Sequence, residues 1–368
     1  MLTCEVGGAM GILGGTIRIA GSGPAGMTAA INLARAGFPV TVYEKHGDSG
    51  QRFHGDMQGL ENWSVDGDIV ADLQAMGLAI NFDCHPFSAL TVSNGSRIWN
   101  FACARPAFYL VKRGDIPGSL DQGLKQQAEA LGVTIRYRSE LPVAEADIIA
   151  TGPLPHHLFA MARGEIFTTG MADIAYGLVN DAAAFKGYSY LLVSKGYGCL
   201  CTVLFDRFGE INNCFEATRE MFGRLVSLEM KTPRPVGGLG SFAAQPVLRR
   251  GASLCVGEAA GLQDLLWGFG MRSAITSGFL AAESIITNTD YAAAAQSFFG
   301  DRLRASIVNR YLWERFGGDN YQWLMDRINR AGDPLAFLHS FHNFNLAQRL
   351  LYPLARRFVG NRYPGLMR

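Results

Sequence analysis

The residues TIRIAGSGPAG at positions 16–26 decide the fold of this 368-residue chain. The apolar residues Ile17–Ala20 predict a short strand, and the alanine-rich residues Ala25–Ala36 predict a helix that ends at Gly37. The β-branched stretch Pro39–Tyr43 predicts a second strand. A strand, a glycine loop, a helix and a strand in this order predict a βαβ unit, the start of a Rossmann-like α/β domain.

The loop inside this unit has the pattern Gly-x-Gly-x-x-Gly. Gly21 allows the tight turn, Gly23 lets the backbone approach a pyrophosphate, and Gly26 allows close packing of the helix on the strand. The free N–H groups and the positive dipole end of the helix favour phosphate binding. Glu44, at the end of the second strand, is placed to accept hydrogen bonds from adenosine ribose hydroxyls. We therefore predict a dinucleotide site.

The rest of the chain alternates between β-rich sequence and sequence of the nucleotide-binding type. The segments Trp63–Leu110 and Ile166–Arg234 are strand-like, with aromatic and β-branched runs. Between them Leu120–Leu131 predicts a helix, and after them Ser253–Val256 predicts a strand and Met271–Thr287 a long helix. This alternation predicts interleaved domains rather than domains that follow one another along the chain.

Composition narrows the class of protein. A net charge of +1 gives no electrostatic reason to expect nucleic acid as a partner. Seven cysteines with no CxxC pair indicate a reducing, cytoplasmic location, and Cys199 and Cys201 are expected to be neighbouring core thiols on one strand face. No apolar stretch reaches the ~18 residues that predict a transmembrane helix. Residues 1–15 lack the basic start of a signal peptide and are assigned no function.

A second glycine-rich segment distinguishes FAD from NAD. CVGEAAG at 255–261 follows a predicted strand, and LWGFGM at 266–271 opens the long helix. Together they resemble the second FAD fingerprint of the p-hydroxybenzoate hydroxylase superfamily. The resemblance implies that Glu258 binds the ribityl chain and that the final glycines bring N–H groups to the flavin O2/N1 edge. Two residues depart from the pattern, Glu258 in place of Asp and Leu265 in place of Pro.

Further segments resemble the geranylgeranyl reductase-like branch of that superfamily. They are Glu44-Lys45, Gly50–Trp63 and Gly257–Ile275, and the resemblance covers residues 16 to about 290. It implies that Arg52 and Arg113 contact the cofactor.

The glycine loop and the resemblance together define the FAD-binding residues that we expect. These are Gly21, Gly23, Pro24, Ala25, Gly26, Glu44, Lys45, Arg52, Arg113, Gly152, Gly257, Glu258, Gly268, Gly270 and Met271. The expected domains are a discontinuous FAD-binding domain (16–62, 111–160 and 236–290), a β-rich substrate domain (63–110 and 161–235) and a C-terminal helical region (291–368).

The type of flavin chemistry is predicted from two absences. Related hydroxylases often carry an Asp-Gly pair where this chain has Ala150–Pro153, and the Trp-x-Trp-x-x-Pro signature of flavin halogenases is missing. We therefore expect reduction of a carbon–carbon double bond in a hydrophobic, isoprenoid or lipid-like substrate, with hydride from flavin N5 and with NAD(P)H or a reduced protein as electron donor. A monooxygenase of an aromatic or alicyclic metabolite and an electron-transfer flavoprotein without a small-molecule product remain alternatives.

Four side chains are candidates for catalysis. His54 and Asp56 follow the cofactor arginine, and they either act on the flavin or hold the loop. Tyr188 and Tyr190 alternate on a predicted strand, and they either line the cavity or form an aromatic core pair. No metal site is predicted, because the histidines have no partners at ligand spacing.

The C-terminal region is basic and aromatic. From Asp301 onward eleven arginines stand against five acidic residues, and there is no lysine. These helices either contact a membrane peripherally, with arginines at anionic headgroups, or pack on the flavin domain and cover the substrate cavity. We favour packing, because aromatic helix faces are usually buried.

Overall fold

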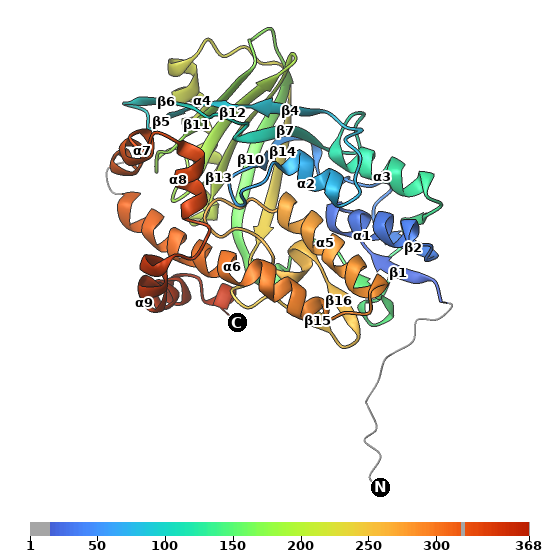
Figure 1. Ribbon diagram of the computed structural model, residues 1–368. Helices are drawn as coiled ribbons and strands as arrows, with labels where there is room; N and C mark the ends of the chain where they lie inside the picture. The colour runs from blue at the N-terminus through green and yellow to red at the C-terminus, as the bar shows by residue number, and fades with distance from the viewer. Residues whose placement is uncertain (1–14, 318–320, 368) are drawn as a thin grey trace.

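A computed structural model describes residues 15–317 and 321–367 (Figure 1); the predictions for residues 1–14 lie outside this part. The N-terminal βαβ unit belongs to a six-stranded sheet with the order β15-β16-β9-β1-β2-β8, parallel except for β15. Its strands are β1 (Ile17–Ala20), β2 (Val40–Glu44), β8 (Thr134–Tyr137), β9 (Ile148–Ile149), β15 (Arg249–Arg250) and β16 (Ser253–Cys255). The predicted Rossmann-like α/β domain is confirmed.

Three helices accompany this sheet, α1 (Pro24–Arg35), α3 (Leu120–Ala130) and α5 (Met271–Ile286). Pro24 occupies the first turn of α1, where its missing N–H costs nothing. Helix α1 packs against both α3 and α5, and its residues from Ala25 to Leu33 are buried. The glycine loop and the start of α5 therefore lie on one rigid unit.

A seven-stranded sheet forms the centre of the molecule, with the order β14-β10-β13-β12-β11-β5-β6 (Figure 1). Its strands are β5 (Ala89–Ser93), β6 (Ile98–Ala102), β10 (Leu158–Thr168), β11 (Ile174–Leu178), β12 (Tyr188–Ser194), β13 (Tyr197–Leu204) and β14 (Lys231–Ser241). Because side chains alternate along a strand, the two faces of the sheet have different neighbours. On β12, Leu191 and Val193 pack into a core beneath α4, whereas Tyr188, Tyr190 and Leu192 face a cavity.

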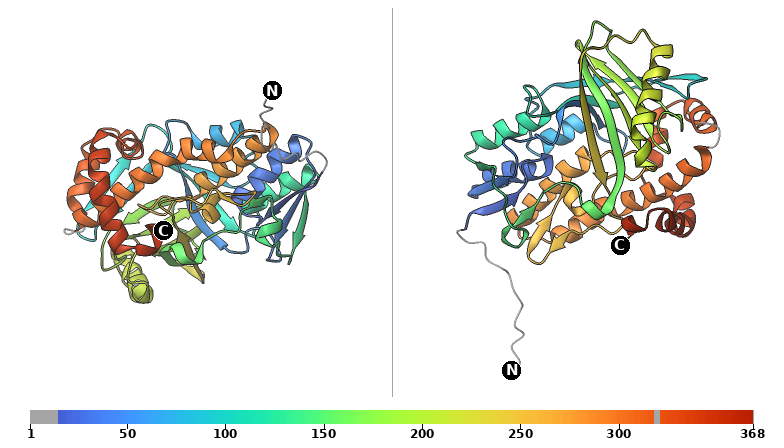
Figure 2. Two further views of the ribbon diagram at one scale, coloured as in Figure 1. Left: turned by 90° about the horizontal axis from the view of Figure 1, so that it is seen from below. Right: turned by 180° about the vertical axis from the view of Figure 1, so that it is seen from behind.

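Helix α4 (Ile211–Leu225) covers the outer face of this sheet, as the view from behind shows (Figure 2). The segment Ile166–Arg234 was predicted to be strand-like, and that prediction is wrong for these residues. Cys214, Phe215, Thr218 and Phe222 are buried, a helical spacing within a β-rich stretch.

A three-stranded sheet, β3-β7-β4, connects the two larger sheets. It contains β3 (His54–Glu61), β4 (Cys84–Phe87) and β7 (Phe108–Gly114), with α2 (Ile69–Ala75) beside it. Strand β3 also contacts β10, β13 and β14. The predicted domain boundaries at 110/111, 160/161 and 235/236 fall within β7, β10 and β14, so these strands run through both predicted domains.

The C-terminal region contains four α-helices in its described residues. They are α6 (Tyr291–Phe316), α7 (Gln322–Asn329), α8 (Pro334–Ser340) and α9 (Leu346–Arg362). Helix α6 packs on α5 and on α9, and Trp313 on α6 stacks on Tyr321 with ring centroids 4.1 Å apart. The helices pack on the rest of the protein, as favoured from the sequence, and this packing leaves one face of α9 exposed.

Candidate flavin site and adjoining chamber

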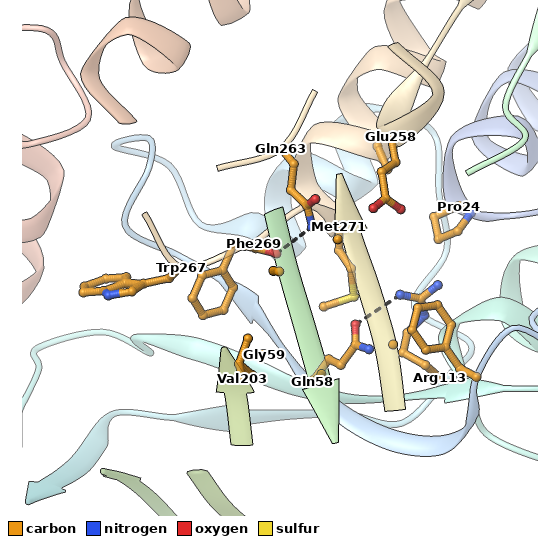
Figure 3. A pocket seen from close by; sticks show the side chains of 18 of the residues that line it. Pro24, Gln58, Gly59, Arg113, Val203, Glu258, Gln263, Trp267, Phe269 and Met271 are labelled. Carbon is orange, nitrogen blue, oxygen red and sulfur yellow. Dashed lines mark hydrogen bonds between the residues drawn. The ribbon is translucent and has the colours of Figure 1, made fainter. Parts of the chain in front are cut away.

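One cavity of about 710 Å³ runs from the glycine loop to the C-terminal helices. The loop after β1, the end of β2, strand β3 and the start of α5 surround one end. The inner face of the seven-stranded sheet and helices α6, α7 and α8 surround the other end. In Figure 3, Pro24, Glu258 and Arg113 lie on one side of the cavity, and Trp267 and Phe269 lie on the other.

The three loop glycines have different neighbours. A Cβ on Gly21 would overlap the carbonyl oxygen of Ala150, and a Cβ on Gly26 would overlap that of Gly21. A Cβ on Gly23 would meet nothing within 4 Å, and Gly23 lines the cavity. Gly21 and Gly26 are therefore required by the packing of the protein itself. The open space at Gly23 fits a pyrophosphate at the N-terminus of α1.

Glu44 is held at the mouth of the glycine loop. One carboxylate oxygen accepts hydrogen bonds from the backbone N–H (3.0 Å) and the hydroxyl (2.8 Å) of Ser22, and the other accepts one from the His46 N–H (3.0 Å). Glu44 and the adjacent Lys45 both line the cavity. This position suits a carboxylate that binds a ribose.

Two predicted cofactor residues, far apart in sequence, form an ion pair. Nη1 of Arg52 lies 2.6 Å from Oε2 of Glu258, and Arg52 also donates to the carbonyl of Leu239. Oε1 of Glu258 accepts a hydrogen bond from the Ser241 N–H at 2.9 Å. Glu258, one methylene longer than the Asp of the fingerprint that this segment resembles, thus contacts both Arg52 and strand β14.

Arg113 is part of a buried polar network. It makes a bidentate pair with Asp121, with N–O distances of 2.9 and 3.0 Å, and donates to Oε1 of Gln58 at 3.2 Å (Figure 3). The other end of the Gln58 amide donates to Asp56 at 2.7 Å. Burial raises the pKa of Asp56, although Gln58 and Arg113 oppose the rise. Gln58 and Arg113 line the cavity, and Asp56 does not line it but is hydrogen-bonded to Gln58.

The turn before α5 is ordered by side chains of its own segment. Gln263 donates to the carbonyl of Gly268 at 2.8 Å (Figure 3), and Asp264 accepts from the Trp267 N–H at 2.8 Å. Oε1 of Gln263 is buried and has no hydrogen-bond partner among the described residues. An unpartnered buried acceptor on a cavity wall is a place where a ligand donor would be stabilised.

The far end of the cavity is an apolar chamber. Aromatic rings follow one another along its wall, with Trp267 in edge contact with Trp63 (6.0 Å between centroids) and with Trp313 (5.8 Å). We define the chamber by Leu90, Val92, Phe101, Tyr188, Tyr190, Trp267, Trp313, Met325, Ile328, Leu335 and Leu338. Such a lining favours a hydrophobic ligand.

Tyr188 and Tyr190 point from β12 into this chamber. The Tyr188 hydroxyl donates to the carbonyl of Trp267 at 2.7 Å. Burial raises the pKa of both tyrosines above its ordinary value, and the neighbouring Cys201 adds to the rise. Both hydroxyls therefore keep their protons at neutral pH. Cys199 and Cys201 are buried free thiols.

Most predicted site residues come together at the cavity. Its lining includes Gly21, Gly23, Pro24, Ala25, Glu44, Lys45, Arg52, Arg113, Gly152, Glu258, Gly268, Gly270, Met271, Tyr188 and Tyr190. Gly26 and Gly257 lie behind this wall, buried in the packing. His54 is exposed, and neither His54 nor Asp56 lines the cavity.

Several lining residues were not predicted from the sequence. Gln58 and Trp63 lie inside the stretch whose resemblance was recognised, and Gln263 and Trp267 lie inside the second fingerprint. The resemblance of those two segments to known flavoproteins could have indicated these four residues. The residues of α6, α7 and α8 had no such signal, because their contact with the chamber depends on tertiary packing. In the described residues no group of three or more His, Cys, Asp or Glu side chains is arranged to hold a metal ion.

Comparisons with known proteins agree on the fold. A family model described as an NAD(P)-binding Rossmann-like domain matches residues 19–74, and a search of curated proteins gave no significant match. A geranylgeranyl bacteriochlorophyll reductase-like protein from Thermoplasma acidophilum has a similar structure, with a TM-score of 0.68 and 16% identity. The similarity covers 94% of this chain and 100% of that one.

Two other solved structures have the same architecture. A flavin-dependent brominase, Bmp2, has a TM-score of 0.62 at 17% identity, over 94% of this chain and 98% of its own. A 2-methyl-3-hydroxypyridine-5-carboxylic acid oxygenase has a TM-score of 0.58 at 18% identity, over 88% and 95%. The chain therefore has a fold used by flavin-dependent enzymes. Among the structures that share it is a geranylgeranyl reductase-like protein, so the predicted resemblance is confirmed for the fold.

Proposed function

We propose that this protein is an FAD-dependent oxidoreductase that reduces a carbon–carbon double bond of a hydrophobic, isoprenoid or lipid-like substrate. The observation that carries this proposal is a continuous cavity that joins the glycine loop at 21–26 to the apolar chamber. The fold shared with a geranylgeranyl bacteriochlorophyll reductase-like protein also supports this proposal.

The polar end of the cavity provides the groups that FAD needs. The N–H groups of the glycine loop would hold the pyrophosphate, Glu44 the ribose, and the Arg52–Glu258 pair the ribityl chain. FAD bound there would supply a hydride from N5, after reduction by NAD(P)H or a reduced protein.

The chamber contributes orientation and a dry environment. Its apolar walls exclude water and hold a hydrocarbon chain, which fixes the double bond relative to the cofactor. Reduction also requires a proton on the second carbon. We assign it to the hydroxyl of Tyr190, because Tyr188 already donates to Trp267 and because His54 and Asp56 lie outside the cavity lining.

The decisive experiment is anaerobic turnover with geranylgeraniol as the probe. Dithionite-reduced holoprotein should be reoxidised by geranylgeraniol, and mass spectrometry should find a product with two additional hydrogen atoms. Tyr190→Phe should slow this step while flavin content is unchanged. Tyr176→Phe, at a tyrosine on the opposite face of the same sheet, whose ring packs on Phe222 of α4, is the matched control.

A monooxygenase of an aromatic or alicyclic metabolite is the second candidate, since an oxygenase shares the fold. It predicts oxygen uptake with NAD(P)H and a hydroxylated product, and this result would contradict the reductase proposal. An electron-transfer protein predicts flavin reduction by a protein donor with no small-molecule product.

A further inference from the structure

The outward face of helix α9 (Leu346–Arg362) is apolar. Leu346, Leu350 and Leu354 are spaced by four residues, so they lie on one side of the helix. Their exposed fractions are 74%, 76% and 53%. Leu346 and Leu350 are the most exposed of the large apolar side chains in the described residues, and Leu354 equals Ile98, at 53%. Scattered exposed leucines are normal on a protein surface, but three in register on one helix form a stripe.

The opposite side of α9 fixes the rotation of the helix. Ala355 and Val359 are buried, and Phe358 packs edge to face on Tyr311 of α6 with centroids 5.3 Å apart. Gln348 donates to Asn309 of α6 at 2.8 Å. The leucine stripe therefore cannot turn inward without breaking this packing.

Arginines lie next to the stripe on one side of the helix. Arg357 lies two turns beyond Leu350, on the same side, and Arg349 and Arg356 border it. Helix α9 contains no acidic residue. Arg349 lies 3.5 Å from Asp301, whereas no ion pair within the described residues involves Arg356 or Arg357.

We propose that this face docks the protein on an anionic lipid surface. The leucines would enter the boundary between headgroups and acyl chains, and the arginines would meet lipid phosphates. The combination of an apolar stripe with uncompensated positive charge favours such a surface over a neutral one. No helix in the described residues is long and apolar enough to cross a membrane, so the contact would be peripheral. The proposal does not depend on the reaction that the protein catalyses.

The test is co-sedimentation of the full chain with vesicles of phosphatidylglycerol and phosphatidylcholine, compared with phosphatidylcholine alone. Wild-type protein should bind the anionic vesicles preferentially, and added salt should weaken binding. The triple variant Leu346→Ser/Leu350→Ser/Leu354→Ser should lower the partition coefficient about tenfold or more. The double variant Arg356→Gln/Arg357→Gln should lower it about tenfold for anionic vesicles only.

Two variants provide matched controls. Ile98→Ser removes an apolar side chain on β6 that is as exposed as Leu354, and Arg224→Gln removes an exposed arginine on α4; both should bind like wild type. Thermal unfolding checks that each variant is folded. Equal vesicle binding by wild type and the triple serine variant would overturn the proposal. So would a dimer in solution that the same serines dissociate, in the absence of vesicle binding, because the face would then belong to a second copy of the chain.

Discussion

The two ends of the cavity are built in opposite ways. The cofactor end depends on backbone and on a few polar side chains, with the loop at 21–26 and Glu44 coming from one βαβ unit. The chamber end is made of apolar side chains from the large sheet, the turn before α5 and three C-terminal helices.

This difference predicts different tolerance to change. A glycine loop binds through closely approaching backbone atoms, so one added methyl group at a close contact disrupts it. An apolar chamber distributes its binding energy over many side chains, and the loss of one removes only a fraction of it. Five experiments test this contrast, from the largest expected effect to the smallest.

Gly26→Ala should have the largest effect, on folding itself. Its Cβ would overlap the carbonyl oxygen of Gly21. Neither the loop nor α1 can shift to relieve this overlap without losing its packing. We expect the free energy of unfolding of the apoprotein to fall by about 3 kcal/mol, measured by denaturant titration. The control Gly23→Ala should cost less than about 1 kcal/mol, since its Cβ meets open space. Equal losses would remove the distinction between the two glycines.

Gly23→Ala should instead act on the cofactor. Its methyl group would occupy the space that fits a pyrophosphate, so the affinity for FAD should fall about tenfold or more, which is about 1.4 kcal/mol. Titration of apoprotein with FAD, followed by flavin fluorescence, measures this. Wild-type affinity in a folded variant would place the phosphates elsewhere.

Glu258→Ala should weaken FAD binding about fivefold, because it leaves the Arg52 guanidinium and the Ser241 N–H without their acceptor. Glu258→Asp keeps the charge and should weaken it less. The same titration compares the two variants. If both lose affinity equally, the role that the family resemblance implies for this residue is wrong.

Leu338→Ala tests the chamber. Leu338 is only partly buried and lines the chamber from α8, so its removal should leave FAD content unchanged. The Kd for geranylgeraniol, measured from the change in flavin absorbance, should rise about threefold. Loss of flavin in this variant would show that the two ends are not separable.

Asp56 should give the smallest effect, a change in pH dependence. Burial raises its pKa above the ordinary 3.8, so the folded state retains a proton that the unfolded state has lost. The stabilisation is present below the unfolded pKa and is lost as pH rises through the folded pKa. Asp56→Asn, which cannot ionise, should lack this loss. Between the unfolded and the folded pKa of Asp56, the difference in unfolding free energy between wild type and variant should therefore change by about 1.4 kcal/mol for each unit of pKa shift. Parallel pH profiles of the two proteins would contradict this prediction.

The cofactor end was largely predictable from the sequence. Gly21, Gly23 and Gly26 act through local backbone geometry, and Glu44 follows directly at the end of the next strand. Local steric and hydrogen-bonding requirements leave a pattern in adjacent residues, and the pattern is visible without coordinates. The second fingerprint is visible for the same reason, although its pairing of Glu258 with Arg52 across 206 positions is not.

The chamber was decided by tertiary structure alone. Trp313, Met325 and Leu338 face it because α6, α7 and α8 pack against the sheet, and an apolar residue in a helix looks the same in sequence whether it faces a core or a cavity. The same reason explains why α4 was taken for strand and why the sequence left two roles open for Asp56, which is hydrogen-bonded to Gln58 of the cavity wall but does not line the cavity itself. The sequence by itself determined the α/β fold and the nucleotide loop, because both rest on local rules. The shape of the cavity and the outward leucines of α9 follow from long-range packing, which no local pattern specifies.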